Sequence, residues 1–276
     1  MPPPYPRVKV LGERNSGTNF VELMLRLNFR VDLLPNAMPF SKEHEAILRR
    51  IPLTELGRDA VFHRATDLSH QTNFRHHAGW KHAALTERHF TEPEHADQTL
   101  FLCVLRHPAP WLISMFRAPF ATFQPDNWPQ TLREFLDTPW VTRFRDELEP
   151  LVLESPARLW ALKTASYLDH SGTHPNAMIV RHEDLLRDHE TTLSRIGDML
   201  ERSGTAWKLP RGNARQAHPR DPDTERDFWQ IRDQLPEDPF AMLDTGLATD
   251  LFNWIGSDLL AKAGYAPPST DPMTTA

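Results

Sequence analysis

One short segment constrains the fold of this chain of 276 residues more than any other, the run VLGERNSGTNF at residues 10–20. Gly12 and Gly17 have the glycine spacing of the phosphate-binding loop G-x-x-x-x-G-K-[ST]. Where that loop carries its lysine and its magnesium-binding hydroxyl, however, Thr18 and Asn19 stand. A loop of this type connects a strand to a helix, so it predicts a sheet with helices packed on it.

The residues around the loop have the required patterns. RVKVLG at residues 7–12 is rich in β-branched residues and predicts a strand, whereas the apolar residues of 18–29 recur at helical spacing. Two further apolar runs, 99–105 and 177–180, have the length of buried parallel strands. Helices are predicted at residues 108–116, 133–148 and 156–168, in a segment directly after 180 and in the range 239–263.

Strands that alternate with helices predict an α/β fold with three layers, of the P-loop type, in which helices flank a central parallel sheet. We expect one domain over residues 1–266 and a disordered tail at 267–276. Residues 30–78 are poorly periodic and predict loops, with short helices around 41–50. The polar range 204–235 predicts a long loop or lid.

The composition is that of an ordinary globular protein, with 39% hydrophobic and 25% charged residues. A formal net charge of -6 argues against a general nucleic-acid binder. The N-terminus lacks the apolar region of a signal peptide, and no apolar run reaches the ~20 residues that span a bilayer. We therefore expect a cytoplasmic protein without a membrane partner. Its single cysteine, Cys103, is expected to be a buried thiol.

The glycine loop predicts an anion site. Backbone N–H groups at the start of a helix bind phosphate or sulfate whatever the side chains do. Ser16, Thr18 and Asn19 add hydroxyl and amide donors, and Arg14 supplies a positive charge. Such a site needs no metal. An ordinary glycine turn between strand and helix is the alternative reading.

A second anion site is predicted at Arg106 and Ser114, in RHPAPWLIS. Arg106 ends the strand 99–105, and ligands of open α/β sheets bind at the carboxyl ends of strands. Ser114 lies two turns into the next helix and can face the same crevice. The alternative is a capping arginine and a small packing serine.

The segment GWKH at residues 79–82 lies between these two sites in the sequence. Near neutral pH the imidazole of His82 can accept a proton from a hydroxyl, and Lys81 can neutralise charge on a transferring group. His76, His77 and His82 match none of the usual zinc-ligand spacings, so no metal is expected.

In their order and spacing, these pieces resemble the sulfotransferases that use 3′-phosphoadenosine 5′-phosphosulfate (PAPS). The run from Arg14 through Asn15, Ser16, Gly17, Thr18 and Asn19 to Phe20 is similar to the PKSGTTW loop that binds the 5′-phosphosulfate in that family. Arg106 and Ser114 reproduce the pair that binds the 3′-phosphate. Residues 80–82 correspond to the K-x-H segment, whose histidine is the base in the cytosolic members.

The resemblance covers most of residues 7–200 and includes VRHEDLL at 180–186, which looks like the RYEDL motif of the family. There are departures. Asn15 occupies the position of the lysine in the family's loop, and His182 replaces the tyrosine that contacts adenine in the family. Lys81 is one residue closer to the histidine, and Arg211-Gly212 is a poor match to the C-terminal Arg-Lys-Gly signature.

The resemblance implies transfer of a sulfuryl group from PAPS to a hydroxyl or amine of a small-molecule or glycan acceptor, without magnesium. Two alternatives stay open, a kinase on a P-loop fold and an inactive nucleotide-binding module. No pattern in the sequence identifies the acceptor or the oligomeric state. Four aromatic residues could line an acceptor site or belong to the core: Phe116, Phe120, Phe123 and Trp128.

Overall fold

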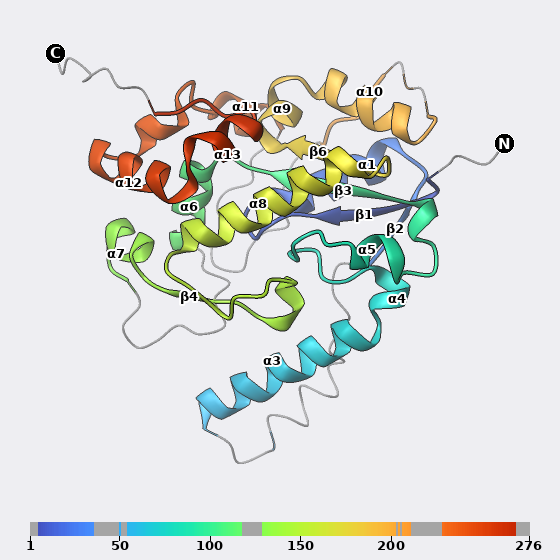
Figure 1. Ribbon diagram of the computed structural model, residues 1–276. Helices are drawn as coiled ribbons and strands as arrows, with labels where there is room; N and C mark the ends of the chain where they lie inside the picture. The colour runs from blue at the N-terminus through green and yellow to red at the C-terminus, as the bar shows by residue number, and fades with distance from the viewer. Residues whose placement is uncertain are drawn as a thin grey trace.

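The computed structural model of the chain describes residues 5–35, 50, 54–117, 129–202, 204, 206–210 and 228–268. Within them, a central sheet of four parallel strands has the order β2-β1-β3-β6 (Figure 1). These strands are β1 (Arg7–Leu11), β2 (Asp32–Leu33), β3 (Thr99–Leu105) and β6 (Ala177–Arg181). The α/β class, the parallel sheet and the three predicted strands are confirmed. Strand β2 was not predicted.

Strand β3 lies at the centre of the molecule, and all seven of its residues are buried. Its side chains alternate between two apolar clusters, because successive residues of a strand point to opposite faces. Phe101, Cys103 and Leu105 belong to one cluster, whereas Leu102 and Val104 belong to the other. The buried free thiol expected for Cys103 is confirmed.

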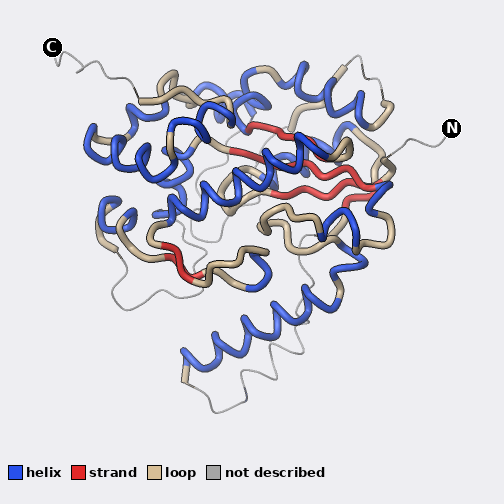
Figure 2. The backbone as a smooth tube through the Cα atoms, in the orientation of Figure 1, coloured by secondary structure: helices blue, strands red, loops and turns tan. Residues whose placement is uncertain are grey.

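Each face of the sheet is covered by helices, which gives the three layers (Figure 2). On the face of Phe101 lie α6 (Pro108–Arg117), α8 (Pro156–Thr173) and α12 (Thr245–Ile255). On the other face lie α1 (Thr18–Asn28), α9 (His182–Arg187), α10 (His189–Met199) and α11 (Phe228–Asp233). Helix α8 crosses in front of the sheet in Figure 1.

Three of the predicted helices are confirmed as α1, α6 and α8. Helix α8 begins where the sequence has a strong start signal. The Ser155 hydroxyl accepts a hydrogen bond from the N–H of Ala157, and Pro156 occupies the first helical position, where its missing N–H costs nothing.

The predicted helix at 133–148 is wrong. Helix α7 (Leu132–Leu136) is followed by a two-stranded antiparallel pair, β4 (Trp140–Val141) and β5 (Val152–Leu153), with the 3-10 turn η2 (Phe144–Asp146) between them. Pro139 explains the early stop, because a residue before proline is driven out of the helical conformation.

Two longer helical predictions are divided in the structure. The segment after 180 forms α9 and α10, separated at Asp188, whose carboxylate caps α10 by accepting from the N–H of Thr191. The range 239–263 forms η3 (Pro239–Met242), α12 and α13 (Ser257–Lys262). Gly256 separates the last two with a φ of 87°, which glycine adopts without strain.

The loops predicted for residues 30–78 are also wrong in their second half. Helix α3 (Glu55–Thr72) is long and projects below the sheet in Figure 1, and α4 (Phe74–His77) follows it. Short elements α5 (Arg88–Thr91) and η1 (Ala96–Gln98) lead to β3. Apart from Arg50, the helices expected around 41–50 fall outside the described residues.

Parts of two other predictions also fall outside the described residues. The range 204–235 is described only in part, and its last residues form α11. The single domain over 1–266 and the tail at 267–276 stay predictions. No helix in the described ranges has the length and hydropathy that crossing a bilayer requires.

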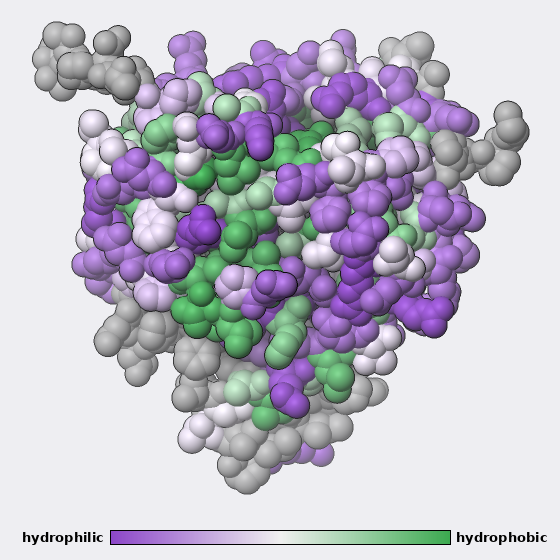
Figure 3. Space-filling view, viewed as in Figure 1, coloured by the Kyte–Doolittle hydropathy of each residue, from purple (hydrophilic) through white to green (hydrophobic). Residues whose placement is uncertain are grey.

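The pair β4–β5 and the neighbouring turn place apolar side chains on the surface. Val141, Phe144 and Val152 are exposed, and Figure 3 shows green apolar areas on this face of the molecule. The opposite side of the pair carries Trp140 and Leu153, which belong to the core. Only one side of this small sheet is therefore used in packing.

Among the described residues, five histidines are buried: His63, His70, His77, His89 and His107. Burial lowers the pKa of His70 to about 3 and that of His77 to about 4. Histidines held neutral in the folded state oppose protonation, whereas in the unfolded chain they take up protons below ~6.5. Stability should therefore fall as the pH falls below this value.

We expect the free energy of unfolding to be several kcal/mol lower at pH 5 than at pH 7.5, because each such histidine contributes up to ~2 kcal/mol over this range. Urea denaturation at a series of pH values measures it. The variant His70→Phe keeps an aromatic ring without a titrating group, so its stability should depend less steeply on pH. A free energy of unfolding that stays constant from pH 7.5 to 5 would contradict the prediction.

Candidate functional site

The glycine loop occupies the position that the sequence predicts, between the end of β1 at Leu11 and the start of α1 at Thr18. Asn15 and Gly17 adopt positive φ values of 62° and 97°. At Gly17 any larger residue would overlap the ring of His182, so this position accepts only glycine. This close approach of His182 to Gly17 places residues 181–185, the RHEDL segment, against the glycine loop.

The start of α1 has the properties of an anion site. No side chain caps this helix. The N–H of Phe20 donates to the carbonyl oxygen of Gly17 at 3.0 Å, and N–H groups at the start of a helix are the usual donors to a bound anion or to water. The hydroxyl of Ser16 is buried beside them and makes no hydrogen bond within the chain. A buried hydroxyl without a partner is costly, and a ligand oxygen at the loop would offer it one.

Arg106 connects the two predicted anion sites. Its Nη1 donates to the hydroxyl of Ser114 at 3.0 Å and to the carbonyl oxygen of Asn15 in the glycine loop at 2.8 Å. The Asn15 side chain in turn donates to the carbonyl oxygen of Ser114 at 3.3 Å. Arg106 after β3, Ser114 of α6 and the glycine loop therefore meet at the carboxyl edge of the sheet.

Residues 79–82 lie against the same loop. The N–H of Gly12 donates to the carbonyl oxygen of Lys81 at 2.8 Å, and Nδ1 of His82 lies 2.6 Å from the carbonyl oxygen of Gly12. Because a carbonyl oxygen only accepts, Nδ1 carries the proton. The lone pair of the neutral His82 ring therefore resides on Nε2, the nitrogen that a base uses.

The surroundings of His82 keep it neutral. Burial lowers its pKa well below the usual value, and the positive charges of Arg14, Lys81 and Lys163 act in the same direction. Burial also lowers the pKa of Lys81, which the nearby Glu22 partly opposes. Lys81 donates to the Asn19 side chain at 2.5 Å, so its charge lies at the first turn of α1.

Arg14 is directed away from the front of the loop. Its guanidinium pairs with Glu13 at 3.0 Å and lies 4.6 Å from the centre of the Trp80 ring. The side chain is 6% exposed. Its charge is therefore shared with a buried carboxylate, and any effect on a ligand acts through this pair.

A buried charge network lies beneath the site, and sequence reasoning missed it. The ammonium of Lys163 in α8 is fully buried and pairs with Glu13 of the glycine loop and with Asp146 of η2, the latter at 2.6 Å. It also donates to the carbonyl oxygen of His82 at 2.5 Å. Burial by itself raises the pKa of Glu13, but Lys163 and Arg14 outweigh it and hold that pKa below its usual range.

Trp80 is the centre of this network. Besides Arg14, the cations of Arg145 and Lys163 lie 4.8 and 5.8 Å from its ring. Arg145 pairs with the buried Asp67 at 2.5 Å. Three carboxylates thus balance three cations around one indole ring, whose face attracts positive charge.

Helix α8 holds the separate parts of the site together. Trp160 Nε1 donates to the carbonyl oxygen of Arg106 at 3.0 Å, and the Tyr167 hydroxyl donates to that of Ala83 at 2.7 Å. Lys163 lies between them on the same face, at helical spacing. One face of α8 therefore fixes the Arg106 turn, the glycine loop and the segment after His82.

A second buried lysine supports residues 77–79 from the sheet. Lys9 of β1 is fully buried and donates to the carbonyl oxygens of Pro35, His77 and Gly79 at 2.6–2.7 Å. Burial lowers its pKa to about 7. Lys9 therefore fixes the start of the GWKH segment, as Lys163 fixes its end.

The RHEDL segment brings aromatic rings to the loop. The ring of Phe20 lies edge-on to His182 at 5.9 Å and stacks with Phe228 of α11 at 6.0 Å. Phe20 itself is buried among the residues beneath α1. His182, rather than Phe20, is the ring that contacts the glycine loop.

The C-terminal segment reaches the site through Glu183. This buried carboxylate accepts from the N–H of His107 at 2.9 Å and from the hydroxyl of Tyr265 at 3.1 Å. The turn after Arg106 is thereby fixed by α9 and by the AGY segment at 263–265. Because the Glu183 carboxylate accepts hydrogen bonds from two groups of the chain, its role in this position is structural.

The three histidines considered as zinc ligands are not brought together as a metal-binding group within the described residues. His76 pairs with Glu94 at 3.6 Å on the surface, whereas His77 packs edge-on to His70 at 5.7 Å. His82 is hydrogen-bonded to the glycine loop, through its Nδ1 and the carbonyl oxygen of Gly12.

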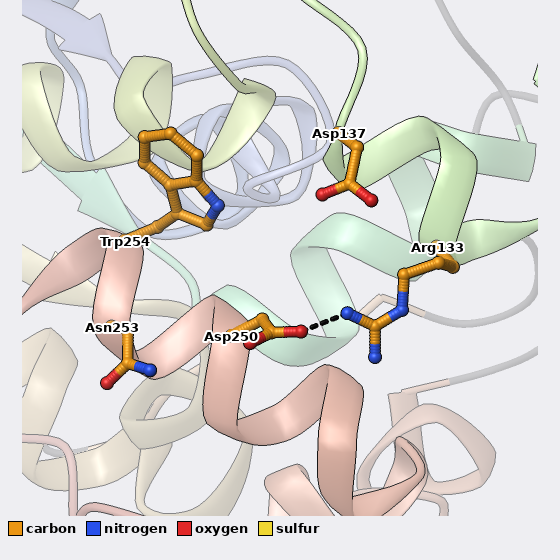
Figure 4. A pocket seen from close by; sticks show the side chains of 5 residues that line it. All are labelled: Arg133, Asp137, Asp250, Asn253 and Trp254. Carbon is orange, nitrogen blue, oxygen red and sulfur yellow. Dashed lines mark hydrogen bonds and ion pairs between the residues drawn. The ribbon is translucent and has the colours of Figure 1, made fainter.

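A pocket of about 360 Å³ lies away from this site, between α7 and α12 (Figure 4). Arg133 points across it to Asp250, with which it forms an ion pair, and Trp254 lines its other side. None of its lining residues belongs to the predicted motifs. Of the aromatic residues considered for an acceptor, Phe116 packs on Phe135, and 118–128 are outside the described residues.

No protein-family model matches the chain, and no curated protein matches it. Among solved structures, it is similar to mouse sulfotransferase SULT7A1 complexed with PAP, at 12% identity and a TM-score of 0.46 over 94% of this chain and 89% of that one. A sulfotransferase domain from the curacin biosynthetic pathway shares 15% identity with a TM-score of 0.43, over 97% and 99% of the two chains.

A third similar structure is retinol dehydratase in complex with androsterone and the inactive cofactor PAP. It shares 13% identity, with a TM-score of 0.48 over 93% of this chain and 81% of that one. These structures are described as sulfotransferases or as complexes with PAP, and their similarity to this chain is remote.

Proposed function

We propose that the protein is a sulfotransferase that moves a sulfuryl group from PAPS to a hydroxyl or amine of a small-molecule or glycan acceptor and releases PAP, the 3′,5′-bisphosphate of adenosine. The observation that carries the proposal is the position of Arg106. Its guanidinium touches both the Ser114 hydroxyl and the glycine loop. Two anion-binding elements in contact suit a nucleotide with phosphates at two positions.

The residues present fit such a nucleotide. The uncapped start of α1, the unpaired Ser16 hydroxyl and the side chains of Thr18 and Asn19 would hold the 5′-phosphosulfate. Arg106 and Ser114 would hold the 3′-phosphate, and His182 would lie beside the base. PAPS, when bound, supplies the sulfuryl group.

His82 is the proposed base. With its proton on Nδ1, it presents the Nε2 lone pair to an acceptor hydroxyl and takes up the proton that the hydroxyl loses. Lys81, at the first turn of α1, would neutralise charge that develops on the leaving phosphate. Arg14 would contribute its charge through the pair with Glu13.

The alternative of a P-loop kinase requires a loop lysine and a carboxylate placed for magnesium. Thr18 stands at the lysine position, and Arg106 follows β3 where an aspartate would be useful. The alternative of an inactive nucleotide-binding module predicts nucleotide binding without turnover. The cytoplasmic location stays a prediction.

Nucleotide binding provides the first test. We expect PAP to bind with equal affinity in EDTA and in magnesium, and ATP to bind much more weakly, because the loop lacks the metal-binding hydroxyl and Arg106 adds a site for a 3′-phosphate. Isothermal titration calorimetry measures both. Binding that requires magnesium, or equal affinity for ATP and PAP, would favour the kinase.

The variant Arg106→Ala tests the second anion site. Removing a charge-assisted hydrogen bond costs ~1.5–3 kcal/mol, so PAP affinity should fall about 10- to 100-fold. Adenosine 5′-phosphosulfate has no 3′-phosphate, so its affinity should change little. Equal losses for the two ligands would show that Arg106 acts by holding the Asn15 carbonyl and thereby the loop.

Turnover itself is tested by incubating the protein with labelled PAPS and a panel of acceptors. We expect label to be transferred to at least one class of hydroxyl or amine. The variant His82→Asn, tested with the same panel, provides the control for background transfer. PAP binding without any transfer would support the inactive module.

A further inference from the structure

A cluster of metal-ligating side chains lies outside the candidate site, where α8 ends. His170 is in the last turn of α8 and His174 caps its C-terminus, while Glu87 directly precedes α5. One ligand atom from each of the three residues lies within 4.8 Å of the others. Across the residues that the structure describes, this is the one group of three with that property.

The geometry points to a divalent metal site at Glu87, His170 and His174, and we propose that it binds zinc. Two imidazoles and one carboxylate are a ligand set that zinc accepts, with a fourth position left for water. Magnesium and calcium prefer oxygen ligands only. The set therefore favours zinc or a similar transition metal over either of these ions.

The arrangement of the two histidines is set by the end of the helix. The N–H of His174 donates to the carbonyl oxygen of His170 at 2.9 Å, and the two rings lie 5.6 Å apart. Nε2 of His174 lies 3.2 Å from a carboxylate oxygen of Glu87, which comes from a segment far away in the sequence. The three ligands are thus assembled by packing before an ion enters.

Phe90 restricts the orientation of the rings. It stacks on His174 with a centroid distance of 3.6 Å and an interplanar angle of 3°, and its ring lies 5.6 Å from that of His170. An apolar wall on one side is common around bound metals, since it orients the ligands and limits the access of water. Glu87 is exposed and both histidines are half-buried, so an ion can enter from solvent.

A metal at this point would join the segment around α5 to the end of α8. The segment 82–86, which carries His82, directly precedes Glu87, and α8 carries Lys163 and Tyr167. The ion would therefore stabilise the packing of two segments that hold the candidate site, the one before α5 and helix α8, without contacting the site itself. The proposal itself does not depend on the proposed sulfuryl transfer.

The test uses the full chain, freed of metal with EDTA and dialysed. Calorimetric titration with zinc should show one ion bound per chain, and zinc should raise the melting temperature. The variants His170→Ala and His174→Ala should each weaken zinc binding at least about 100-fold, because the loss of a direct ligand should exceed the 10–100-fold effect of changing a residue that only hydrogen-bonds a ligand. Neither variant should then gain thermal stability from zinc.

His76→Ala is the matched control, because His76 also pairs with a glutamate on the surface but has no third ligand. It should bind zinc as the unmutated protein does. Cobalt(II) bound to the unmutated protein gives an independent reading, since a four-coordinate site has a strong visible absorption. No zinc uptake, uptake unaffected by His170→Ala and His174→Ala, or equal loss in His76→Ala would each overturn the proposal.

Discussion

Replacing His82 by alanine is expected to lower kcat by about 10²–10⁴-fold, the usual contribution of a general base. The expectation rests on the tautomer. With Nδ1 donating to the Gly12 carbonyl oxygen, the neutral ring presents a lone pair at Nε2. The affinity for PAP should change little, because the base faces the acceptor. Initial rates with saturating PAPS and calorimetry with PAP measure the two quantities.

The variant His82→Asn separates catalysis from structure. The asparagine amide can still donate to the Gly12 carbonyl oxygen, so the loop should keep its position and the melting temperature should be preserved. Because asparagine cannot accept the proton, kcat should fall as far as in His82→Ala. Normal turnover in His82→Asn would remove His82 from the chemistry and leave Lys81 as the candidate.

The pH dependence of kcat adds a third reading for His82. Its pKa is lowered well below the usual value by burial and by the cations around it. A base is active when deprotonated, so kcat should stay constant as the pH falls through 6.5 and decrease only at lower pH. A decrease centred at ~6.5 would indicate a histidine with the ordinary pKa.

The second large effect is expected for Lys163→Met. Removing this fully buried ammonium leaves Glu13 with only Arg14, and Asp146 without its cation. Breaking a buried ion pair from one side typically costs 3–5 kcal/mol, so we expect a loss of about that size in the free energy of unfolding. Urea denaturation at pH 7.5 measures it.

Two further variants identify the cause of that loss. In Lys163→Met with Asp146→Asn, one uncompensated charge is removed, so the double variant should be more stable than the sum of the single effects predicts. Arg7→Met breaks an ion pair with Asp32 that is partly exposed, and should cost less than about 1 kcal/mol. Equal effects of Lys163→Met and Arg7→Met would show that burial of the network has no energetic consequence.

The same double variant reports on positioning. Lys163 holds the glycine loop through Glu13 and the His82 segment through its carbonyl oxygen. If it positions the two relative to each other, the stability that Asp146→Asn regains should not be accompanied by a gain in kcat. Full recovery of kcat together with stability would assign Lys163 a role in folding alone.

The sequence by itself determined the features that depend on short-range geometry. Gly12 and Gly17 predicted the loop because a larger residue would overlap the carbonyl oxygen of Val104 at Gly12 and the ring of His182 at Gly17. The apolar runs predicted β3 and β6, since a strand buried on both faces needs apolar residues. The β-branched residues of 7–12 predicted β1. Arg106 and Ser114 were predicted as a pair because helical spacing brings residues two turns apart to one side.

The ends of helices were predicted less well. A single residue can end a helix although the apolar periodicity continues beyond it. Pro139 ends a helix that the apolar periodicity of 133–148 would have continued, and Asp188 divides the segment after 180. Helix α3 has almost no apolar periodicity of its own. Its packing against η2 and the capping by Thr54 decide its formation, and periodicity reports neither.

The tertiary structure alone decided how the site is supported. Glu13 and Lys163 are separated by 150 positions, and Lys9 and Gly79 by 70. Before folding, any of the chain's charged residues can pair with any other, so no local pattern selects these partners. Their selection comes from burial, because a charge removed from water must find an opposite charge or a carbonyl oxygen close by. The same packing directs Arg14 to Glu13 and Trp80, and it brings Glu87 to His170 and His174. Neither arrangement was predicted from the sequence.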